Sequence, residues 1–165
     1  MMQNIVLCGF MGCGKSTVGR LLASKTGRHF IDLDSLIEQR EQRTVAQIFE
    51  QDGEDYFRKV ETNCLQELYQ KSNVVLATGG GTLIKEENAA LIKQMGKLVF
   101  LNPPFETLAK RIENDPRRPL SGDDRLRERY ESRLPQYKKA ADCTVEGNKS
   151  PHDIVLLILS ELRNL

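Results

Sequence analysis

A glycine-rich segment near the N-terminus constrains the fold of this chain more than any other feature. Residues 9–17 read Gly-Phe-Met-Gly-Cys-Gly-Lys-Ser-Thr and fit the pattern G-x-x-x-x-G-K-[ST]. The segment directly follows an apolar run at 4–8 and directly precedes a helical pattern at about 15–26. In this context the backbone N–H groups of the loop and the helix N-terminus hold phosphate oxygens. The sequence therefore predicts a nucleoside triphosphate site at the end of a first buried strand.

The polar positions of this loop have separate predicted roles. Lys15 reaches the β- and γ-phosphates, and the Ser16 hydroxyl is a ligand of Mg²⁺. The glycines allow close approach of the backbone and positive φ angles. We therefore expect Mg²⁺ as a cofactor and the following nucleotide-binding positions: Gly12, Cys13, Gly14, Lys15, Ser16 and Thr17.

The remaining chain alternates short apolar runs with helical patterns, which is typical of an α/β fold with a parallel sheet. Ser150 and Pro151 form an N-cap and N1 pair that opens a last helix. With 165 residues and no repeat or long linker, the chain has room for a single domain. Four further strands are expected at 30–33, 74–77, 97–101 and 142–145.

Two stretches interrupt the alternation of strands and helices. About forty residues between the second and third strands hold two or three helices, one of them at about 54–70, and form an insertion beside the sheet. Residues 115–124 contain two prolines and a glycine, which prevent a regular helix, and two adjacent arginines, Arg117 and Arg118. We expect this loop to close over the triphosphate as a lid that excludes water.

Composition excludes several classes of function. The 24 Lys and Arg balance 23 Asp and Glu, whereas a nucleic-acid-binding protein normally carries a basic excess. No apolar run approaches the roughly 20 residues of a membrane helix, and no signal peptide is recognised. The four cysteines form no Cys-x-x-Cys pair, which argues against a zinc site and for reduced thiols. We expect a cytoplasmic monomer that acts on a small molecule, without nucleic-acid or membrane partners.

The positions of acidic residues after the strands distinguish the functional classes of proteins that contain a phosphate loop. A GTPase needs the guanine-reading motif Asn-Lys-x-Asp, but residues 148–151 read Asn-Lys-Ser-Pro and lack the Asp. A motor or helicase normally has an Asp at the end of a central strand, but no carboxylate follows the strand at 74–77. Asp32 and Asp34 close the second strand, at the edge where open α/β sheets bind ligands. One carboxylate would support Mg²⁺ waters while the other orients or deprotonates an acceptor hydroxyl, which favours phosphoryl transfer. The alternative for such a residue, Asp34 in particular, is a helix N-cap.

Six short motifs are spread over nearly the whole chain. They are residues 9–17 with Val18-Gly19-Arg20, then Asp32-Leu33-Asp34, Phe57-Arg58, Gly79-Gly80-Gly81, Arg118-Pro119-Leu120 and Arg133-Leu134-Pro135-Gln136-Tyr137. In order and spacing they resemble the motifs of the shikimate kinases. The resemblance implies a nucleoside-monophosphate-kinase-like fold, with three α/β/α layers around a five-stranded parallel sheet. It also implies one kinase domain at 1–165, with a substrate-binding insertion at about 33–61 and a lid at about 112–125.

The resemblance implies transfer of the ATP γ-phosphate to the 3-hydroxyl of shikimate, a step in aromatic amino-acid biosynthesis. Asp34 then binds the ring hydroxyls and acts as the catalytic base or orienter, and Asp32 supports Mg²⁺. Arg58 and Arg133 clamp the carboxylate, because guanidinium groups bind carboxylates bidentately. Backbone amides at three glycines approach the substrate: Gly79, Gly80 and Gly81.

The resemblance also assigns the nucleotide side of the site. Arg118, before Pro-Leu, binds the γ-phosphate and joins Lys15 and Asp34 as catalytic residues. Arg111 and Pro151 are similar to the pair that sandwiches adenine in the family. Cys13 occupies a free position of the phosphate loop, where we expect ATP to shield it from alkylation.

Two other functions stay open at this point. A gluconate or nucleotide kinase shares the fold, and gluconate also carries a carboxylate and hydroxyls, so Arg58 and Arg133 alone do not exclude it. A non-catalytic ATP-binding regulator needs no acceptor carboxylate site. An Asp34→Asn variant distinguishes a kinase from such a regulator, because only the kinase loses turnover while ATP affinity barely changes.

Overall fold

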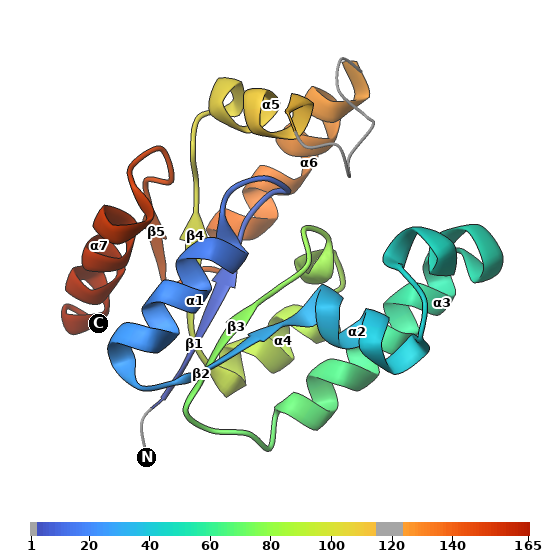
Figure 1. The fold of residues 1–165 in the computed structure, drawn as a ribbon, viewed down its shortest axis with the longest axis horizontal. Coiled ribbons are helices and arrows are strands. Elements are labelled where there is room, and N and C mark those ends of the chain that lie inside the picture. Colours follow the sequence, from blue (N-terminus) through green and yellow to red (C-terminus); the bar gives the residue numbers. More distant parts are fainter. Residues whose placement is uncertain (1–2, 115–123) are drawn as a thin grey trace.

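The computed structural model describes residues 3–114 and 124–165, and its strands form one parallel sheet (Figure 1). Strand order is β2-β3-β1-β4-β5. The α/β class predicted from the sequence is confirmed, and each strand begins and ends within one residue of its predicted bounds. The strands are β1 (Asn4–Cys8), β2 (His29–Asp32), β3 (Val74–Ala77), β4 (Gly96–Leu101) and β5 (Cys143–Val145).

Helices cover both faces of this sheet and give three layers. On one face α1 packs against α7, and on the other α3 packs against α4 (Figure 1). The predicted N-cap of the last helix is present, since the Ser150 hydroxyl accepts from the Asp153 N–H at 3.2 Å. The helices are α1 (Lys15–Thr26), α2 (Leu33–Glu41), α3 (Val45–Leu68), α4 (Glu86–Met95), α5 (Phe105–Glu113), α6 (Asp124–Ala140) and α7 (Pro151–Arg163), with a 3₁₀ turn, η1 (Thr82–Ile84).

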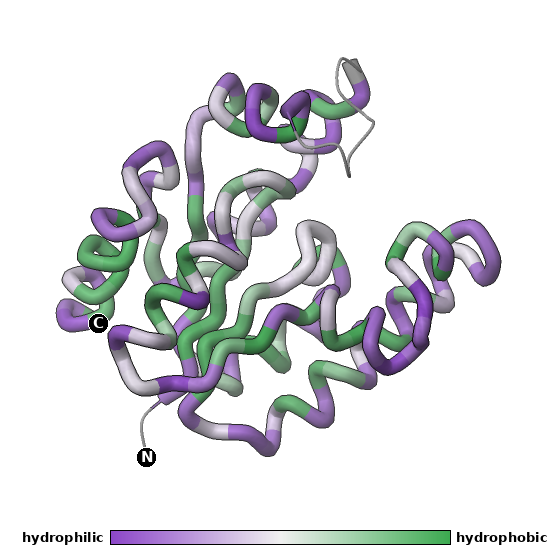
Figure 2. Tube along the Cα trace, in the orientation of Figure 1, coloured by the Kyte–Doolittle hydropathy of each residue, from purple (hydrophilic) through white to green (hydrophobic). Residues whose placement is uncertain are grey.

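The hydrophobic core lies between the helical layers, along the central strands. All residues of β1 and β3 are buried, as expected for parallel strands covered on both faces. Figure 2 shows the hydrophobic residues concentrated on these strands and the hydrophilic ones on the outer helix faces. Such strands appear in the sequence as continuous apolar runs, which is why their positions could be predicted.

The insertion projects from the β2 edge of the sheet as α2 and α3 (Figure 1). The predicted helix at 54–70 is only part of α3, which begins at Val45 and continues across a break at Gly53. Gly53 has a φ of +81°, a conformation that L side chains rarely adopt. A capping box between Thr44 and Gln47 starts the preceding helical piece. The prediction of two or three helices in this insertion is therefore confirmed, although the bounds of the piece before Gly53 were not predicted because it offers too few turns for a clear apolar period.

Within residues 3–114 and 124–165, no helix is long and apolar enough to cross a membrane. The predicted lid arginines, Arg117 and Arg118, and most of the expected lid at 112–125 lie outside the described residues.

Candidate active site

The phosphate loop, residues 9–17, joins β1 to α1 and leaves the N-terminus of α1 without a side-chain cap. The N-cap residue is Gly14, with a φ of +95°, and the first turn contains no acidic residue. By contrast, α2 and α7 are capped by side chains of Asp32 and Ser150. The first N–H groups of α1 thus lack a side-chain acceptor and point to where an anion would bind. This geometry suits the phosphates of a nucleotide.

Lys15 lies folded over the phosphate loop. Its Nζ donates hydrogen bonds to the carbonyl oxygens of Gly9 at 2.7 Å and Phe10 at 3.2 Å. It also lies 3.5 Å from Cys13 Sγ. To reach a bound phosphate, the ammonium group has to exchange these carbonyl contacts for phosphate oxygens, which a flexible four-carbon side chain allows.

The structure corrects the expectation that ATP shields Cys13 from alkylation. The Cys13 side chain is fully buried, so the protein itself shields the thiol from alkylation. It turns beneath the loop, where a Cβ on Gly9 would lie 2.7 Å from its sulfur. Its backbone N–H donates to the Phe10 carbonyl oxygen at 3.2 Å, so this residue is held within the loop.

Ser16 and Asp32 form a pair of hard oxygen donors beside the phosphate loop. Ser16 Oγ donates to Asp32 Oδ2 at 2.5 Å, and Asp32 Oδ1 accepts from the Ser35 N–H at 3.1 Å. Asp32 is therefore the N-cap of α2, the role that the sequence left open for either aspartate. A hydroxyl and a carboxylate fit Mg²⁺, which prefers few protein oxygens together with water and phosphate. No cluster of three or more His, Cys, Asp or Glu able to hold a metal occurs in the described part of the chain.

Asp34 lies in the first turn of α2 and is half-buried against the loop that follows β3. We call that loop the glycine loop, residues 79–81. A Cβ built on Gly79 would lie 2.8 Å from Asp34 Oδ1. Burial raises the pKa of Asp34 to about 6, and the nearby carboxylates of Asp32 and Glu61 add to the rise. A carboxylate with a pKa near neutrality is suited to accept a proton from a hydroxyl.

Arg58 contacts the same loop from α3. A Cβ on Gly81 would collide with the Arg58 guanidinium. Arg58 Nη1 donates to Glu61 Oε2 at 2.8 Å, and the fully buried Glu61 accepts from Thr82 Oγ1 at 2.6 Å. Arg58 also pairs with the exposed Glu54 at 3.3 Å. The Glu61 carboxylate, which is held by Thr82, thus fixes the position of the Arg58 guanidinium.

Arg133 approaches the middle of the glycine loop from α6. A Cβ on Gly80 would lie 3.4 Å from Arg133 Nη1 and 3.6 Å from the Met11 backbone nitrogen in the phosphate loop. The guanidinium also lies over the Phe10 ring, 5.7 Å from its centroid. Burial lowers the pKa of Arg133 from its ordinary value, although a guanidinium stays charged at neutral pH. Three predicted residues from three helices therefore meet at one glycine loop beside the phosphate loop.

On the nucleotide side, Arg111 bridges two loops. Its Nη1 donates to the Gly12 carbonyl at 3.3 Å and its Nη2 to the Gly147 carbonyl at 3.2 Å. Gly12 belongs to the phosphate loop, and Gly147 precedes α7, whose first residue is Pro151. Thr17 is exposed in the first turn of α1.

The comparisons with known proteins agree with this geometry. The family model described as shikimate kinase matches residues 11–163. The shikimate kinase of Persephonella marina is 40% identical over 98% of this chain and 100% of its own length. This chain belongs to the shikimate kinase family.

Solved shikimate kinases have the same fold as this one. The enzyme from Acinetobacter baumannii, solved in complex with shikimate, is 38% identical with a TM-score of 0.91, covering 99% of this chain and 94% of that chain. A gluconokinase from Sinorhizobium meliloti aligns over 98% of this chain and 92% of its own with a TM-score of 0.60 and 19% identity, which shows a shared fold alone. As a shikimate kinase, the chain is an ATP-dependent kinase of the shikimate pathway.

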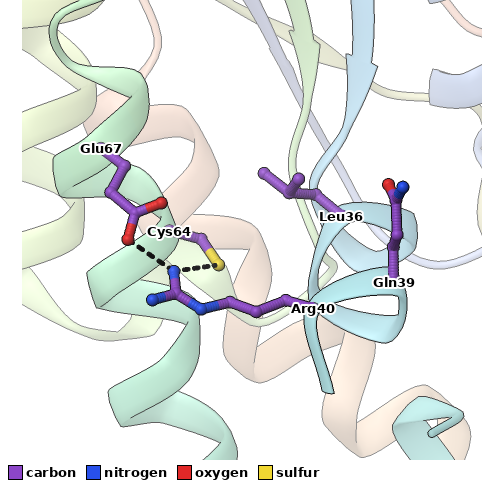
Figure 3. A pocket seen from close by; sticks show the side chains of 5 residues that line it. All are labelled: Leu36, Gln39, Arg40, Cys64 and Glu67. Atoms are coloured by element: carbon purple, nitrogen blue, oxygen red, sulfur yellow. Dashed lines mark hydrogen bonds and ion pairs between the residues drawn. The ribbon is translucent and has the colours of Figure 1, made fainter. Parts of the chain in front are cut away.

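A hollow lies between α2 and α3 (Figure 3). Arg40 Nη1 crosses it to Glu67 Oε1 at 2.6 Å and lies 3.7 Å from Cys64 Sγ. None of the predicted site residues lines it. Its side chains are Leu36, Gln39, Arg40, Cys64 and Glu67.

The sequence analysis did not predict a role for Glu61, whose carboxylate accepts a hydrogen bond from Arg58. Glu61 is fully buried on α3, three residues after Arg58 and next to the buried Val60. An acidic residue inside an apolar helical stripe, one turn from an arginine, is the signal that could have found it.

Proposed function

We propose that this chain transfers the γ-phosphate of ATP to the 3-hydroxyl of shikimate, giving shikimate 3-phosphate and ADP. One observation carries the proposal: Asp34, Arg58 and Arg133 meet at the glycine loop, next to the phosphate loop. Shikimate is a small ring with one carboxylate and three hydroxyls. Two guanidinium groups and one carboxylate of raised pKa complement those groups.

In this mechanism the chain chiefly orients the acceptor hydroxyl toward the nucleotide. Arg58 and Arg133 hold the shikimate carboxylate, and amides of the glycine loop approach the ring. Asp34 then accepts the proton of the 3-hydroxyl or aligns that hydroxyl for attack. Because the acceptor is held at both ends, the reaction becomes effectively intramolecular.

Lys15, with Arg118 from the expected lid, would neutralise charge on the transferred phosphoryl group. Ser16 and Asp32 would hold Mg²⁺, which when bound neutralises the β- and γ-phosphate oxygens. The backbone N–H groups of residues 12–17 would hold the phosphates of ATP. Arg111 and Pro151 would lie on either side of the adenine ring. The contact of Arg111 with the Gly12 carbonyl supports this side of the site.

The remaining expectations complete the proposal. We propose a cytoplasmic monomer made of one kinase domain, with a substrate-binding insertion at about 33–61 and a lid at about 112–125. The net charge of +1 supports a small-molecule substrate and no nucleic-acid partner.

The test is an ADP-release assay with Mg-ATP that compares shikimate, gluconate and a set of nucleoside monophosphates as acceptors. The proposal predicts turnover with shikimate alone. Equal or faster turnover with gluconate or a nucleoside monophosphate would contradict the acceptor assignment. ATP binding without turnover of any acceptor would contradict the kinase reaction.

We predict that kcat/KM for shikimate falls as the pH is lowered through the Asp34 pKa. With a pKa of about 6, most of the carboxylate is protonated at pH 5, so kcat/KM should drop about tenfold between about pH 7 and pH 5. Enzyme held at the lower pH and then assayed at neutral pH controls for irreversible loss. A flat profile over this range would show that ionised Asp34 is not required.

We predict that Gly81→Ala raises KM for shikimate more than Gly80→Ala does. The new Cβ at Gly81 meets the Arg58 guanidinium, which Glu61 holds in place, so the arginine has to leave its position. At Gly80 the nearest atom is 3.4 Å away, a nearly ordinary contact. Steady-state kinetics with saturating ATP measure the difference, and equal KM values for the two variants would contradict it.

A further inference from the structure

Helix α6 carries a buried tyrosine that contacts the glycine loop. Tyr137 is only 2% exposed, and its hydroxyl donates a hydrogen bond to the Gly80 carbonyl oxygen. Its ring packs on Phe100 of β4, with the ring centroids 5.1 Å apart. The ring is therefore anchored on the sheet while the hydroxyl reaches the loop.

The Tyr137 hydroxyl donates to the middle carbonyl of the glycine loop, whereas the other two carbonyls accept from backbone N–H groups of η1. The Gly79 carbonyl accepts from the Thr82 N–H at 3.3 Å, and the Gly81 carbonyl accepts from the Ile84 N–H at 3.1 Å. Only the Gly80 carbonyl turns to α6 for its donor. Because a peptide group is planar, fixing this carbonyl also fixes the direction of the Gly81 N–H.

Tyr137 also lies one helical turn after Arg133. Such i, i+4 pairs meet on the surface of a helix, and the two side chains interact here. Arg133 in turn lies beside Gly80. The phenol that donates to the loop peptide thus also interacts with the guanidinium that approaches Gly80. Burial raises the pKa of Tyr137 above its ordinary value, so the hydroxyl stays protonated and able to donate.

We propose that Tyr137 is a positioning residue for the acceptor, holding the Gly80–Gly81 peptide and Arg133 in one fixed geometry. It acts through these groups and does not touch the substrate. The inference rests on the proposed function, since it assumes that the glycine loop and Arg133 bind shikimate. Without the hydroxyl, the partly buried Gly80 carbonyl loses this donor, and the peptide is no longer tied to α6.

The test is Tyr137→Phe, which keeps the ring and its packing on Phe100 but removes the hydroxyl. We expect KM for shikimate to rise about tenfold, while KM for ATP changes less than about twofold and kcat less than about threefold. The matched control is Tyr130→Phe on the same helix, whose hydroxyl faces Asn102 Oδ1 at 3.5 Å. This control should leave all three kinetic constants near those of the unmodified chain.

Kinetics are measured below the melting temperature of each variant, and the rise in Tm caused by saturating shikimate gives a second readout. We expect that rise to shrink in Tyr137→Phe and to persist in Tyr130→Phe. A lower Tm with an unchanged KM for shikimate would overturn the inference, because the role would then be structural only. Equal rises in both KM values would overturn it as well. Failure of the proposed function would appear differently, as absence of ADP release by the unmodified chain with shikimate.

Discussion

Replacing Asp34 by Asn is expected to lower kcat by about 10²–10⁴-fold while ATP affinity changes less than about twofold. The amide keeps the size of the side chain beside Gly79 but cannot accept the hydroxyl proton as a carboxylate does. The phosphate loop, which binds the nucleotide, is not altered. Steady-state kinetics together with calorimetric titration of ATP check both parts of this prediction.

The same variant should be more stable than the unmodified chain at neutral pH. In the folded chain the Asp34 pKa is about 6, against 3.8 as its ordinary value. Between these two values the folded state binds more protons than the unfolded state, so stability falls as pH rises from about 4 to about 6. The ionised carboxylate therefore costs about 1–3 kcal/mol at pH 7, which Asn does not incur. Thermal melts should show a higher Tm for Asp34→Asn at pH 7, and little difference near pH 4.

The matched control is Asp55→Asn, the same change at an exposed residue of the insertion. It should leave both kcat and Tm near their original values. If Asp34→Asn kept more than about a tenth of the original kcat, the carboxylate would not be the base or orienter of the reaction. A parallel loss of ATP affinity would point instead to a defect on the nucleotide side.

Removing the charge of Arg58 is the second change with a large expected effect. In Arg58→Gln the fully buried Glu61 loses its nearest cation, and breaking a buried pair from one side costs about 3–5 kcal/mol. The lost carboxylate contact should raise KM for shikimate by about 10–100-fold. Chemical denaturation and kinetics measure the two effects separately.

A double variant separates the structural role of Arg58 from its role in binding. Arg58→Gln with Glu61→Gln leaves no buried charge, so most of the lost stability should return while KM for shikimate stays high. The control is Arg40→Gln, whose ion pair with Glu67 has partners 42% and 63% exposed and should contribute less than about 1 kcal/mol. If the double variant regained the original KM, Arg58 would not hold the acceptor carboxylate.

The strands and the phosphate loop could be predicted because their signals are local. Buried parallel strands appear as continuous apolar runs, and the loop pattern fixes both the end of β1 and the start of α1. The meeting of Asp34, Arg58 and Arg133 could not follow from local patterns, because they lie on three different helices. The family resemblance supplied that grouping, and the structure places all three at the glycine loop.

Three other features of the site depend on tertiary contacts, which local sequence patterns do not predict. Cys13 occupies a free position of the loop, and only the packing beneath the loop decides that its thiol turns inward. Two aspartates lie close to the start of α2, and the sequence does not distinguish which of them is the N-cap; in the structure the Ser35 N–H donates to Asp32. Tyr137 stands inside a recognised motif, yet its contact with Gly80 appears only once α6 is packed beside the sheet.

The most direct test of the central claim is the chemical identity of the product. The chain is incubated with Mg-ATP and shikimate, and the phosphorylated position is read from ³¹P–¹H couplings by NMR. The account predicts a single new phosphate ester on the 3-hydroxyl, formed together with ADP. A phosphate on another hydroxyl, or inorganic phosphate as the only product, would contradict the proposed orientation of the acceptor at Asp34.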